Sequence, residues 1–367
     1  MKVLFINAVC GTGSTGKICA ELAEKYEQEG HEVKIAYGRQ AFVPEKYRKY
    51  AVRIGSDLDV KIHALYTRVT DRHGLASKRA TKKFLAWAEI YSPDILWLHN
   101  IHGYYINYEM LFAWIKTHPE MEVKWTLHDC WAFTGHCPHF TAAGCDKWKV
   151  RCCDCPEKKQ YPASNVMDNS RDNYKRKKRA FCGVHNLTII TPSKWLANLV
   201  KESYLREYPV EVVYNTIDTN VFKPTESTFR KKYNIEHKKI ILGVANVWNV
   251  RKGFDDFIKL AKLLSDDYVV VLVGLDEKQL KGLPDNVIGV MRTNGPKELA
   301  GIYTTADVFV NLTYEDTYPT VNLEAKACGT PVITYRTGGS VESVDENNII
   351  EVGDITSLCK KIETICL

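Results

Sequence analysis

Short, almost continuously apolar runs recur along the chain and alternate with longer stretches in which apolar residues return every three or four positions. The short runs predict β-strands, and the longer stretches predict helices. Strands that are apolar on both faces are typical of a parallel sheet covered by helices on either side. The sequence therefore predicts an α/β protein.

The apolar runs fall into two series. Strands are expected at residues 2–7, 33–37, 94–99, 123–128 and 187–191, and then at residues 240–245, 269–274, 287–291, 307–312 and 331–335. Between the first two runs, Ile18, Leu22 and Tyr26 share one face of a helix predicted for residues 16–29, which ends at Gly30. This strand–helix–strand order predicts two Rossmann-like domains in tandem.

The length of the chain agrees with two domains. Single domains usually hold about 100–200 residues, and this chain has 367. A linker-like stretch at residues 212–227 separates the two series. We therefore expect one domain at residues 1–220, with a cysteine-rich insertion at about 130–160, and a second at residues 221–367. Ligands of such sheets bind beyond the carboxyl ends of the strands, so two facing domains would form one cleft.

Composition excludes several classes of protein. Hydrophobic residues make up 45% of the chain and charged residues 26%, which is ordinary for a packed protein and far from disorder. No stretch approaches the ~20 apolar residues of a membrane helix, and the first apolar run is too short for the core of a signal peptide. A cytoplasmic location is expected.

The most specific segment is YEDTYPTVNLEAKACGTPVITY, at residues 314–335. A short helix is predicted to begin near Pro319 and to end at Gly329. Asp316 precedes this helix and Glu324 lies within it, so both carboxylates can face one ligand. Backbone amides at a helix start bind phosphate, and carboxylates accept hydrogen bonds from vicinal hydroxyls. A nucleotide sugar carries both groups, and its anion is predicted to meet Tyr318, Pro319, Thr320 and Val321.

This segment resembles the signature of glycosyltransferase family 4, in which two acidic residues are separated by seven others. Members of that family are retaining nucleotide-sugar enzymes of the GT-B fold, with two Rossmann-like domains that face each other across a cleft. The resemblance covers nearly the whole chain and is most specific at residues 307–333. It implies that Glu324 binds the ribose of the donor. It also implies that Asp316, where glutamate is commoner, contacts the donor sugar.

Two cations precede a predicted helix in ILGVANVWNVRKGFDDFIKLA, at residues 241–261. Arg251 and Lys252 are poorly placed for the positive end of a helix, so an anionic ligand is the natural explanation. Lys252 and Gly253 resemble the family's lysine–glycine pair at the donor diphosphate, and Arg251 is a looser match to its arginine. Charge accumulates on a departing diphosphate, so these cations would act there, and no catalytic metal is expected.

Polar residues also follow the predicted strands of the first domain. His128 ends one of them and is expected to hydrogen-bond a sugar hydroxyl, a position where the family resemblance also implies a histidine. His99 and His102 follow the preceding strand and could line the same cleft. Histidines with purely local partners are the alternative for all three.

A glycine-rich turn, GTGSTGKI, follows the first predicted strand. Ile18 stands where a nucleotide triphosphatase needs a hydroxyl for magnesium, which argues against that class. The turn still lets the backbone approach a ligand, and it resembles the first loop of the family, near the donor phosphate and acceptor. Its candidate residues are Gly13, Ser14, Thr15 and Gly16, and a simple tight turn is the alternative.

Six of the twelve cysteines lie between Cys130 and Cys155. A reducing cytoplasm argues against a disulfide framework. Dense spacing of thiols is typical of structural zinc, and a closed four-thiolate shell leaves no position for catalytic water. The predicted ligands are Cys137, Cys145, Cys152 and Cys155, with His136 or His139 as a replacement for one of them. Free buried thiols, or redox and disulfide chemistry, are the alternatives.

The formal net charge is +6, and its densest part is the run of five cations at residues 175–179. A solvated helix face and contact with the inner face of a membrane are both compatible with this run. The charge is too weak overall for a nucleic-acid-binding protein.

Together these features predict a glycosyltransferase that uses a UDP- or GDP-sugar. By resemblance, residues 1–220 form the acceptor side and residues 221–367 the donor side, and transfer proceeds with retention. The acceptor is expected to be a glycan or a lipid-linked oligosaccharide in cell-surface polysaccharide synthesis. A nucleotide-sugar epimerase or phosphorylase of the same fold, and a zinc-containing nucleic-acid-binding protein, are the alternatives.

Overall fold

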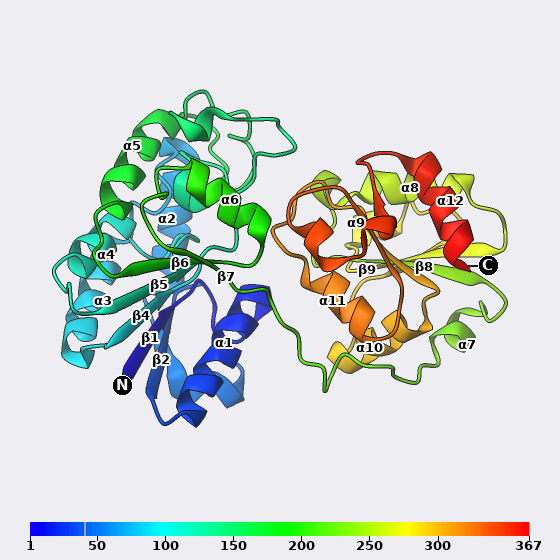
Figure 1. Cartoon of the computed structure of the whole chain (residues 1–367), viewed down its shortest axis with the longest axis horizontal. Coiled ribbons are helices and arrows are strands. Elements are labelled where there is room, and N and C mark those ends of the chain that lie inside the picture. The colour runs from blue at the N-terminus through cyan, green and yellow to red at the C-terminus, as the bar shows by residue number, and fades with distance from the viewer. Residues whose placement is uncertain (40–41, 367) are drawn as a thin grey trace. The chain divides into compact units, whose positions relative to one another are not determined.

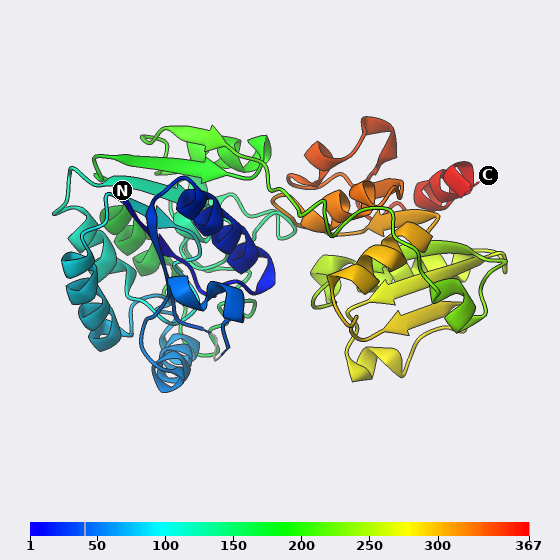
Figure 2. The same cartoon turned by 90° about the horizontal axis from the view of Figure 1, so that it is seen from below.

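The computed structural model describes residues 1–39 and 42–366. The chain forms two compact units, an N-terminal unit at Met1–Tyr214 and a C-terminal unit that begins at Asn215 (Figure 1). Each unit contains one sheet with helices packed against it (Figure 2).

In the N-terminal unit the described residues form a seven-stranded parallel sheet with the order β3-β2-β1-β4-β5-β6-β7. The strands are β1 (Lys2–Ile6), β2 (Glu32–Tyr37), β3 (Ala51–Arg53), β4 (Ile95–Leu98), β5 (Glu122–Thr126), β6 (Leu187–Thr191) and β7 (Val210–Val212). The helices are α1 (Gly13–Gln28), α2 (Asp57–Thr70), α3 (Lys78–Tyr91), α4 (Tyr108–Ile115), α5 (Ser170–Phe181) and α6 (Lys194–Glu202).

In the C-terminal unit the described residues form a six-stranded parallel sheet with the order β10-β9-β8-β11-β12-β13. The strands are β8 (Lys239–Val244), β9 (Tyr268–Val273), β10 (Val287–Val290), β11 (Val308–Asn311), β12 (Val332–Tyr335) and β13 (Ile349–Ile350). The helices are α7 (Phe229–Tyr233), α8 (Phe254–Leu263), α9 (Glu277–Leu280), α10 (Pro296–Thr305), α11 (Thr320–Ala327) and α12 (Ile355–Cys366).

Both faces of each sheet are buried, as the apolar strands require. In β1, Leu4 packs in one buried cluster with α3 and α4, whereas the next residue, Phe5, packs in another with α1. In β8, Ile241 packs with α8 and α12, whereas Leu242 packs with α10 and α11. Successive strand residues point to opposite faces, so apolar residues are needed at every position.

These findings confirm the predicted fold class, with two Rossmann-like units built on parallel sheets. The predicted strands agree with the observed ones to within about two residues, as is usual for strand ends. The sequence missed β3, β7 and β13, which have only two or three residues each and lie at or near sheet edges. The predicted cleft between the domains stays a prediction.

Within the described parts of the chain, no helix combines the length and the apolar character needed to cross a membrane.

Candidate active site

The order of strands in the C-terminal sheet brings two loops together. β8 is paired with β9 on one side and with β11 on the other, so the connections that leave β8 and β11 diverge to opposite sides. Such a switch point opens a crevice at the carboxyl ends of parallel strands, where ligands bind. The loop after β8 carries Arg251 and Lys252, and the loop after β11 carries Asp316.

The two loops are joined by direct hydrogen bonds. The Tyr314 amide donates to the Arg251 carbonyl oxygen over 2.8 Å, and the Arg251 guanidinium donates to the Glu315 carbonyl oxygen over 3.0 Å. Gly253 has φ +73, and a Cβ there would lie 2.2 Å from the carbonyl oxygen of Leu312. Only glycine fits where these loops cross, so the residue after Lys252 is fixed by packing.

Lys252 and Asp316 form an ion pair across this switch point. Lys252 Nζ lies 2.7 Å from Asp316 Oδ2, and both side chains are partly buried. The backbone of Asp316 is held as well, because the Gly339 amide donates to its carbonyl oxygen over 3.0 Å. The pair therefore places a cation and a carboxylate, 64 residues apart in the chain, at one point.

Helix α11 presents its N-terminus to the same loop. Pro319 immediately precedes the helix with φ −72, a value that suits a helix start, and Gly329 follows its end with φ +85. The first turn holds no acidic residue to occupy the positive end of the helix. Thr320 and Val321 of this turn are partly exposed, whereas Tyr318 is buried. This helix start can accept an anion.

Glu324 lies on α11, where the hydroxyl of the buried Tyr303 donates to its Oε2 over 3.0 Å. Burial, and then the charge of Glu324, raise the pKa of Tyr303 well above its usual value, so it remains a neutral donor. Tyr303 could not be predicted from the sequence, because nothing in its spacing links it to Glu324. One oxygen of the carboxylate is thereby fixed by the protein.

In the N-terminal sheet, the switch point lies between β1 and β4. The Asn7 side chain follows β1 and accepts a hydrogen bond of 3.2 Å from the Asn100 amide, which follows β4. His99 Nδ1 lies 3.0 Å from Nε2 of His128, which follows β5. The structure therefore brings His99 and His128 together at the carboxyl edge.

Both histidines are neutral at neutral pH. Burial lowers the pKa of His128 to about 4, and burial together with His128 lowers the pKa of His99 well below its usual value. Nε2 of His99 is buried and has no hydrogen-bond partner among the described residues. His128 is therefore suited to neutral hydrogen bonding with a hydroxyl rather than to carrying a proton at neutral pH.

His102 pairs with Asp129, a residue for which no role was predicted. His102 Nε2 lies 2.9 Å from Asp129 Oδ2, and the Trp131 amide donates to Oδ1 of Asp129 over 2.9 Å. Burial alone would raise the pKa of Asp129, but the charge and hydrogen bond of His102 keep it well below its usual value. Its position directly after His128, at the end of a predicted strand, was the feature of the sequence that could have indicated Asp129.

The glycine-rich turn forms the start of α1, which begins at Gly13. Gly13 and Ser14 are exposed, Thr15 is partly exposed, and Gly16 is buried against Val9. A Cβ at Gly13 would meet nothing within 4 Å, so space remains beside this first turn. Three of the four predicted residues are thus accessible from solvent.

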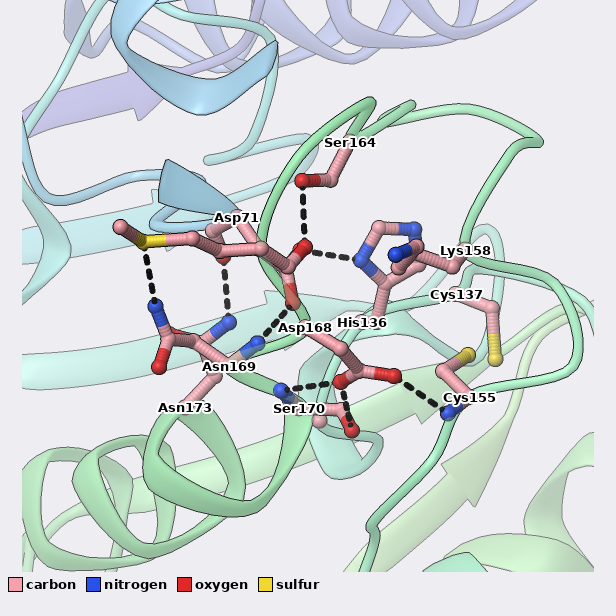
Figure 3. A network of polar contacts seen from close by, with 12 residues as sticks. Asp71, His136, Cys137, Cys155, Lys158, Ser164, Asp168, Asn169, Ser170 and Asn173 are labelled. Atoms are coloured by element: carbon pink, nitrogen blue, oxygen red, sulfur yellow. Dashed lines mark hydrogen bonds and ion pairs between the residues drawn. The ribbon is translucent and has the colours of Figure 1, made fainter. Parts of the chain in front are cut away.

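The four predicted zinc ligands lie in one loop region of the N-terminal unit. Cys137, Cys145, Cys152 and Cys155 line one small cavity. Cys152 Sγ accepts a hydrogen bond from the Gly135 amide over 3.1 Å. The free thiols of Cys137 and Cys155 lie next to each other (Figure 3) and share a hydrogen bond. Among the residues that the structure describes, no group of three or more His, Cys, Asp or Glu could hold a metal ion. The zinc prediction is therefore not supported.

Polar contacts hold this loop to the rest of the N-terminal unit. His136 Nδ1 forms a short ion-paired contact with Asp71, which follows α2, and the Asn169 amide donates to the same carboxylate over 2.7 Å (Figure 3). The Cys155 amide donates to Asp168 over 2.7 Å. Carboxylates of Asp71 and Asp168 therefore anchor the cysteine-rich loop.

The basic run at residues 175–179 lies on α5 and is largely occupied by local contacts. Lys177 is buried, and its Nζ donates to the carbonyl oxygens of Trp131 and Thr134 over 2.7 and 3.1 Å. Burial lowers the pKa of Lys177 to about 7. Arg176 and Arg179 both pair with Glu109, at 2.8 and 3.6 Å. The run is not a continuous basic surface.

Comparison with known proteins agrees with this geometry. A family model described as Glycosyltransferase Family 4 matches residues 15–221, and one described as Glycosyl transferases group 1 matches residues 225–367. The chain is 22% identical to the putative colanic acid biosynthesis glycosyl transferase WcaC of Escherichia coli, over 95% of this chain and 86% of the relative. It is 29% identical to the N-acetyl-alpha-D-glucosaminyl L-malate synthase of Bacillus anthracis, over 48% of this chain and 49% of the relative.

Solved structures show the same fold. The sucrose-phosphate synthase of Thermosynechococcus elongatus is similar with a TM-score of 0.71 and 16% identity, over 99% of this chain and 89% of that one. HepE of Anabaena in complex with UDP is similar with a TM-score of 0.66 and 16% identity, over the same shares of the two chains.

Two Rossmann-like units, with polar clusters at their switch points and matches to glycosyltransferase models along both, define a hexosyltransferase-type enzyme of the GT-B fold. One of these matches spans more than half of the sequence. The chain belongs to glycosyltransferase family 4.

Proposed function

We propose that this enzyme transfers a sugar from a nucleoside diphosphate sugar to a glycan or lipid-linked acceptor, with retention at the anomeric carbon. The observation that carries the proposal is the Lys252–Asp316 ion pair, which lies at the switch point of the C-terminal sheet beside the N-terminus of α11. The cation and the helix start suit the phosphate groups of such a donor, and the carboxylate suits its hydroxyl groups.

The C-terminal unit, residues 221–367 in the predicted division, binds the donor in this proposal. Lys252 and the first turn of α11 take the diphosphate, with Arg251 in support because its guanidinium also fixes the Glu315 carbonyl group. Glu324 accepts hydrogen bonds from the ribose, since Tyr303 orients its carboxylate. Asp316 contacts the donor sugar.

In the reaction, the bond between the anomeric carbon and the diphosphate oxygen breaks while the acceptor hydroxyl attacks the same face. Negative charge grows on the leaving diphosphate, where Lys252 and the α11 N-terminus stabilise it. A diphosphate oxygen accepts the proton of the hydroxyl. Transfer in this scheme uses no catalytic metal.

The N-terminal unit, residues 1–220 in the predicted division, binds the acceptor. His128 is neutral and partly buried at the carboxyl edge of the sheet, where it can exchange a hydrogen bond with a sugar hydroxyl. Gly13, Ser14, Thr15 and Gly16 begin α1 at the same edge of the sheet, because α1 follows β1. They are proposed to lie near donor phosphate and acceptor.

The setting is proposed to be cell-surface polysaccharide synthesis in the cytoplasm, with peripheral contact at the inner face of the membrane. Support for polysaccharide synthesis comes from the names of similar proteins. They include the colanic acid biosynthesis glycosyl transferase WcaC and the N,N'-diacetylbacillosaminyl-diphospho-undecaprenol alpha-1,3-N-acetylgalactosaminyltransferase of Campylobacter jejuni. HepE complexes with UDP and with UDP-glucose favour a uridine nucleotide over a guanosine one.

Calorimetric titration of UDP and GDP into the wild type and a Glu324→Ala variant tests the donor site. We expect UDP to bind and the variant to bind it roughly 10- to 100-fold more weakly, because charge-assisted hydrogen bonds are lost. The matched control is Glu363→Ala, which removes an exposed glutamate of α12. If neither nucleotide bound, or if both variants behaved as the wild type, the donor-site assignment would be wrong.

A further inference from the structure

Helix α2 carries its large apolar side chains on the outside. Leu58, Ile62, Leu65 and Val69 are 65%, 56%, 64% and 42% exposed. Their spacing of four, three and four residues places them along one face of the helix, here called the α2 stripe. In Figure 2, α2 is the blue helix seen nearly end-on at the lower margin of the N-terminal unit.

The side of α2 that faces its own unit is more polar, although Val60 packs against the core there. The fully buried residues of the helix are His63 and Thr67. His63 Nδ1 lies 2.8 Å from the Ser77 hydroxyl, and its Nε2 accepts a hydrogen bond of 3.1 Å from the Gly74 amide. Apart from Val60, the large aliphatic residues of α2 therefore lie on its exposed side, whereas such residues normally face the core.

The helix is held firmly in this orientation. Ser56 and Asp59 form a capping box at its N-terminus, and Asp71 lies in the left-handed conformation at its C-terminus. The Asp71 carboxylate is fixed by His136 and by the Asn169 amide. Polar contacts thus keep the α2 stripe facing outward, so the exposed apolar surface is a stable feature of the fold.

Exposed cations lie on α2 and on the first turns of α3, where Arg79 and Lys83 line a cavity together with Ser56 and Asp59 at the start of α2. Lys61 and Arg68 lie on the exposed side of α2, and the first turns of α3 add four exposed cations, Lys78, Arg79, Lys82 and Lys83. Among the described residues, none of these six side chains takes part in an ion pair, whereas the nearby acids are occupied. Asp57 pairs with Arg53, and Asp59 is bound within the capping box.

We infer that the α2 stripe and its six cations dock the protein on an anionic lipid bilayer. Apolar side chains would enter the boundary between headgroups and acyl chains, while the cations meet lipid phosphates. A second copy of the chain is a poorer occupant, because a two-fold contact between identical stripes would oppose like charges. The inference deepens the proposed membrane contact and assigns it to α2 rather than to the basic run of α5.

Co-sedimentation with vesicles tests this assignment. The vesicles contain equal parts of phosphatidylglycerol and phosphatidylcholine, and vesicles of phosphatidylcholine alone serve for comparison. We expect the wild type to bind the anionic vesicles more strongly. The double variant Ile62→Glu/Leu65→Glu should bind them at least about tenfold more weakly. A Lys61→Gln/Arg68→Gln variant should lose most of the preference for anionic lipid.

Two control variants make the test specific. Ile90→Glu/Val150→Glu also places two carboxylates at exposed apolar positions, which are 85% and 84% exposed and lie outside the α2 stripe. Lys178→Gln/Arg179→Gln removes two cations from α5. Both should bind the vesicles as the wild type does. Thermal unfolding measured by circular dichroism shows whether each variant folds.

Three outcomes would overturn the assignment. If the wild type does not bind anionic vesicles, the proposed membrane contact is wrong. If the α2 variants bind the vesicles as well as the wild type does, the membrane contact lies elsewhere on the surface. If the wild type forms a dimer and does not bind vesicles, and the Ile62→Glu/Leu65→Glu variant is a monomer, the α2 stripe binds a second copy of the chain. UDP titration is measured separately, so failure of the donor site and failure of the docking surface are distinguishable.

Discussion

Tyr303 on α10 and Glu324 on α11 are joined by a hydrogen bond of 3.0 Å from the tyrosine hydroxyl to carboxylate Oε2. Tyr303 is fully buried, so its hydroxyl has a fixed direction. The bond connects a core residue to the carboxylate proposed to bind ribose. Positioning of Glu324 therefore depends on the packing of α10 against α11.

Replacement of Tyr303 by phenylalanine tests this dependence. Loss of one hydrogen bond to a carboxylate should weaken UDP binding about three- to tenfold while the melting temperature changes little. Calorimetry measures the affinity, and circular dichroism measures the melting temperature. Tyr335→Phe is the matched control, because its buried hydroxyl donates to Asp256 over 2.9 Å, away from Glu324. Equal affinities for UDP in both variants and the wild type would contradict the role of Tyr303.

Substitution of Lys252 by methionine should separate phosphate recognition from base recognition. Removal of the cation should weaken UDP binding about 10- to 100-fold and leave uridine binding nearly unchanged, because uridine carries no phosphate. Titration of both ligands into each variant measures this difference. Lys259→Met is the control, since Lys259 is exposed and pairs with Asp256 at 2.8 Å. A similar loss for both ligands would show that Lys252 acts on the whole site rather than on the diphosphate.

Gly338 is predicted to tolerate no side chain. Its φ is +50, and a Cβ there would lie 2.1 Å from the carbonyl oxygen of Asp316. Gly338→Ala should therefore destabilise the C-terminal unit by about 1–3 kcal/mol, and should also weaken UDP binding because Asp316 is displaced. Urea unfolding measures the stability. Gly282→Ala is the control, because a Cβ there would meet nothing within 4 Å, and an equal effect in both variants would refute the steric explanation.

The stability of the N-terminal unit should fall as the pH drops below about 6.5. Burial lowers the pKa of His63 to about 4, so the folded state keeps this histidine neutral while the unfolded state binds a proton. The stabilisation is fully present above pH 6.5 and is lost as the pH falls towards 4. At pH 5 this histidine alone lowers the free energy of unfolding by about 2 kcal/mol relative to pH 7.

Urea unfolding at pH 7 and pH 5 measures this effect. Tryptophan fluorescence reports mainly on the N-terminal unit, because every tryptophan except Trp248 lies there. A His63→Gln variant should lose less stability between the two pH values than the wild type, whereas His237→Gln, at an exposed position of the C-terminal unit, should not. An unchanged pH dependence in His63→Gln would assign the effect to other groups.

Much of the fold could be predicted because its signal is local. Apolar runs such as those of β8 and β9 are buried on both faces, so each residue of the strand carries the pattern. Asp316 and Lys252 were predicted as site residues because each follows a strand and precedes a helix. The short strand β13 has only two residues and leaves no comparable pattern.

Contacts between distant residues could not be predicted in the same way. The bond of Tyr303 to Glu324 depends on how two helices pack. The cysteine spacing suggested zinc, yet the direction of each thiol depends on the folded loop, where Cys152 turns to the Gly135 amide. The run at residues 175–179 suggested a basic surface, but Lys177 is buried because the turn of α5 directs it inward.

The sequence by itself determined the parallel α/β architecture, the two-part organisation and the loops in which polar site residues lie. These properties follow from hydrophobic periodicity and from turn residues, which act over a few positions along the chain. Only the tertiary structure decided that Lys252 meets Asp316, that His99 meets His128, and that α2 turns its aliphatic side outward. Such relationships depend on strand order and helix packing, which join residues with no local relation in the sequence.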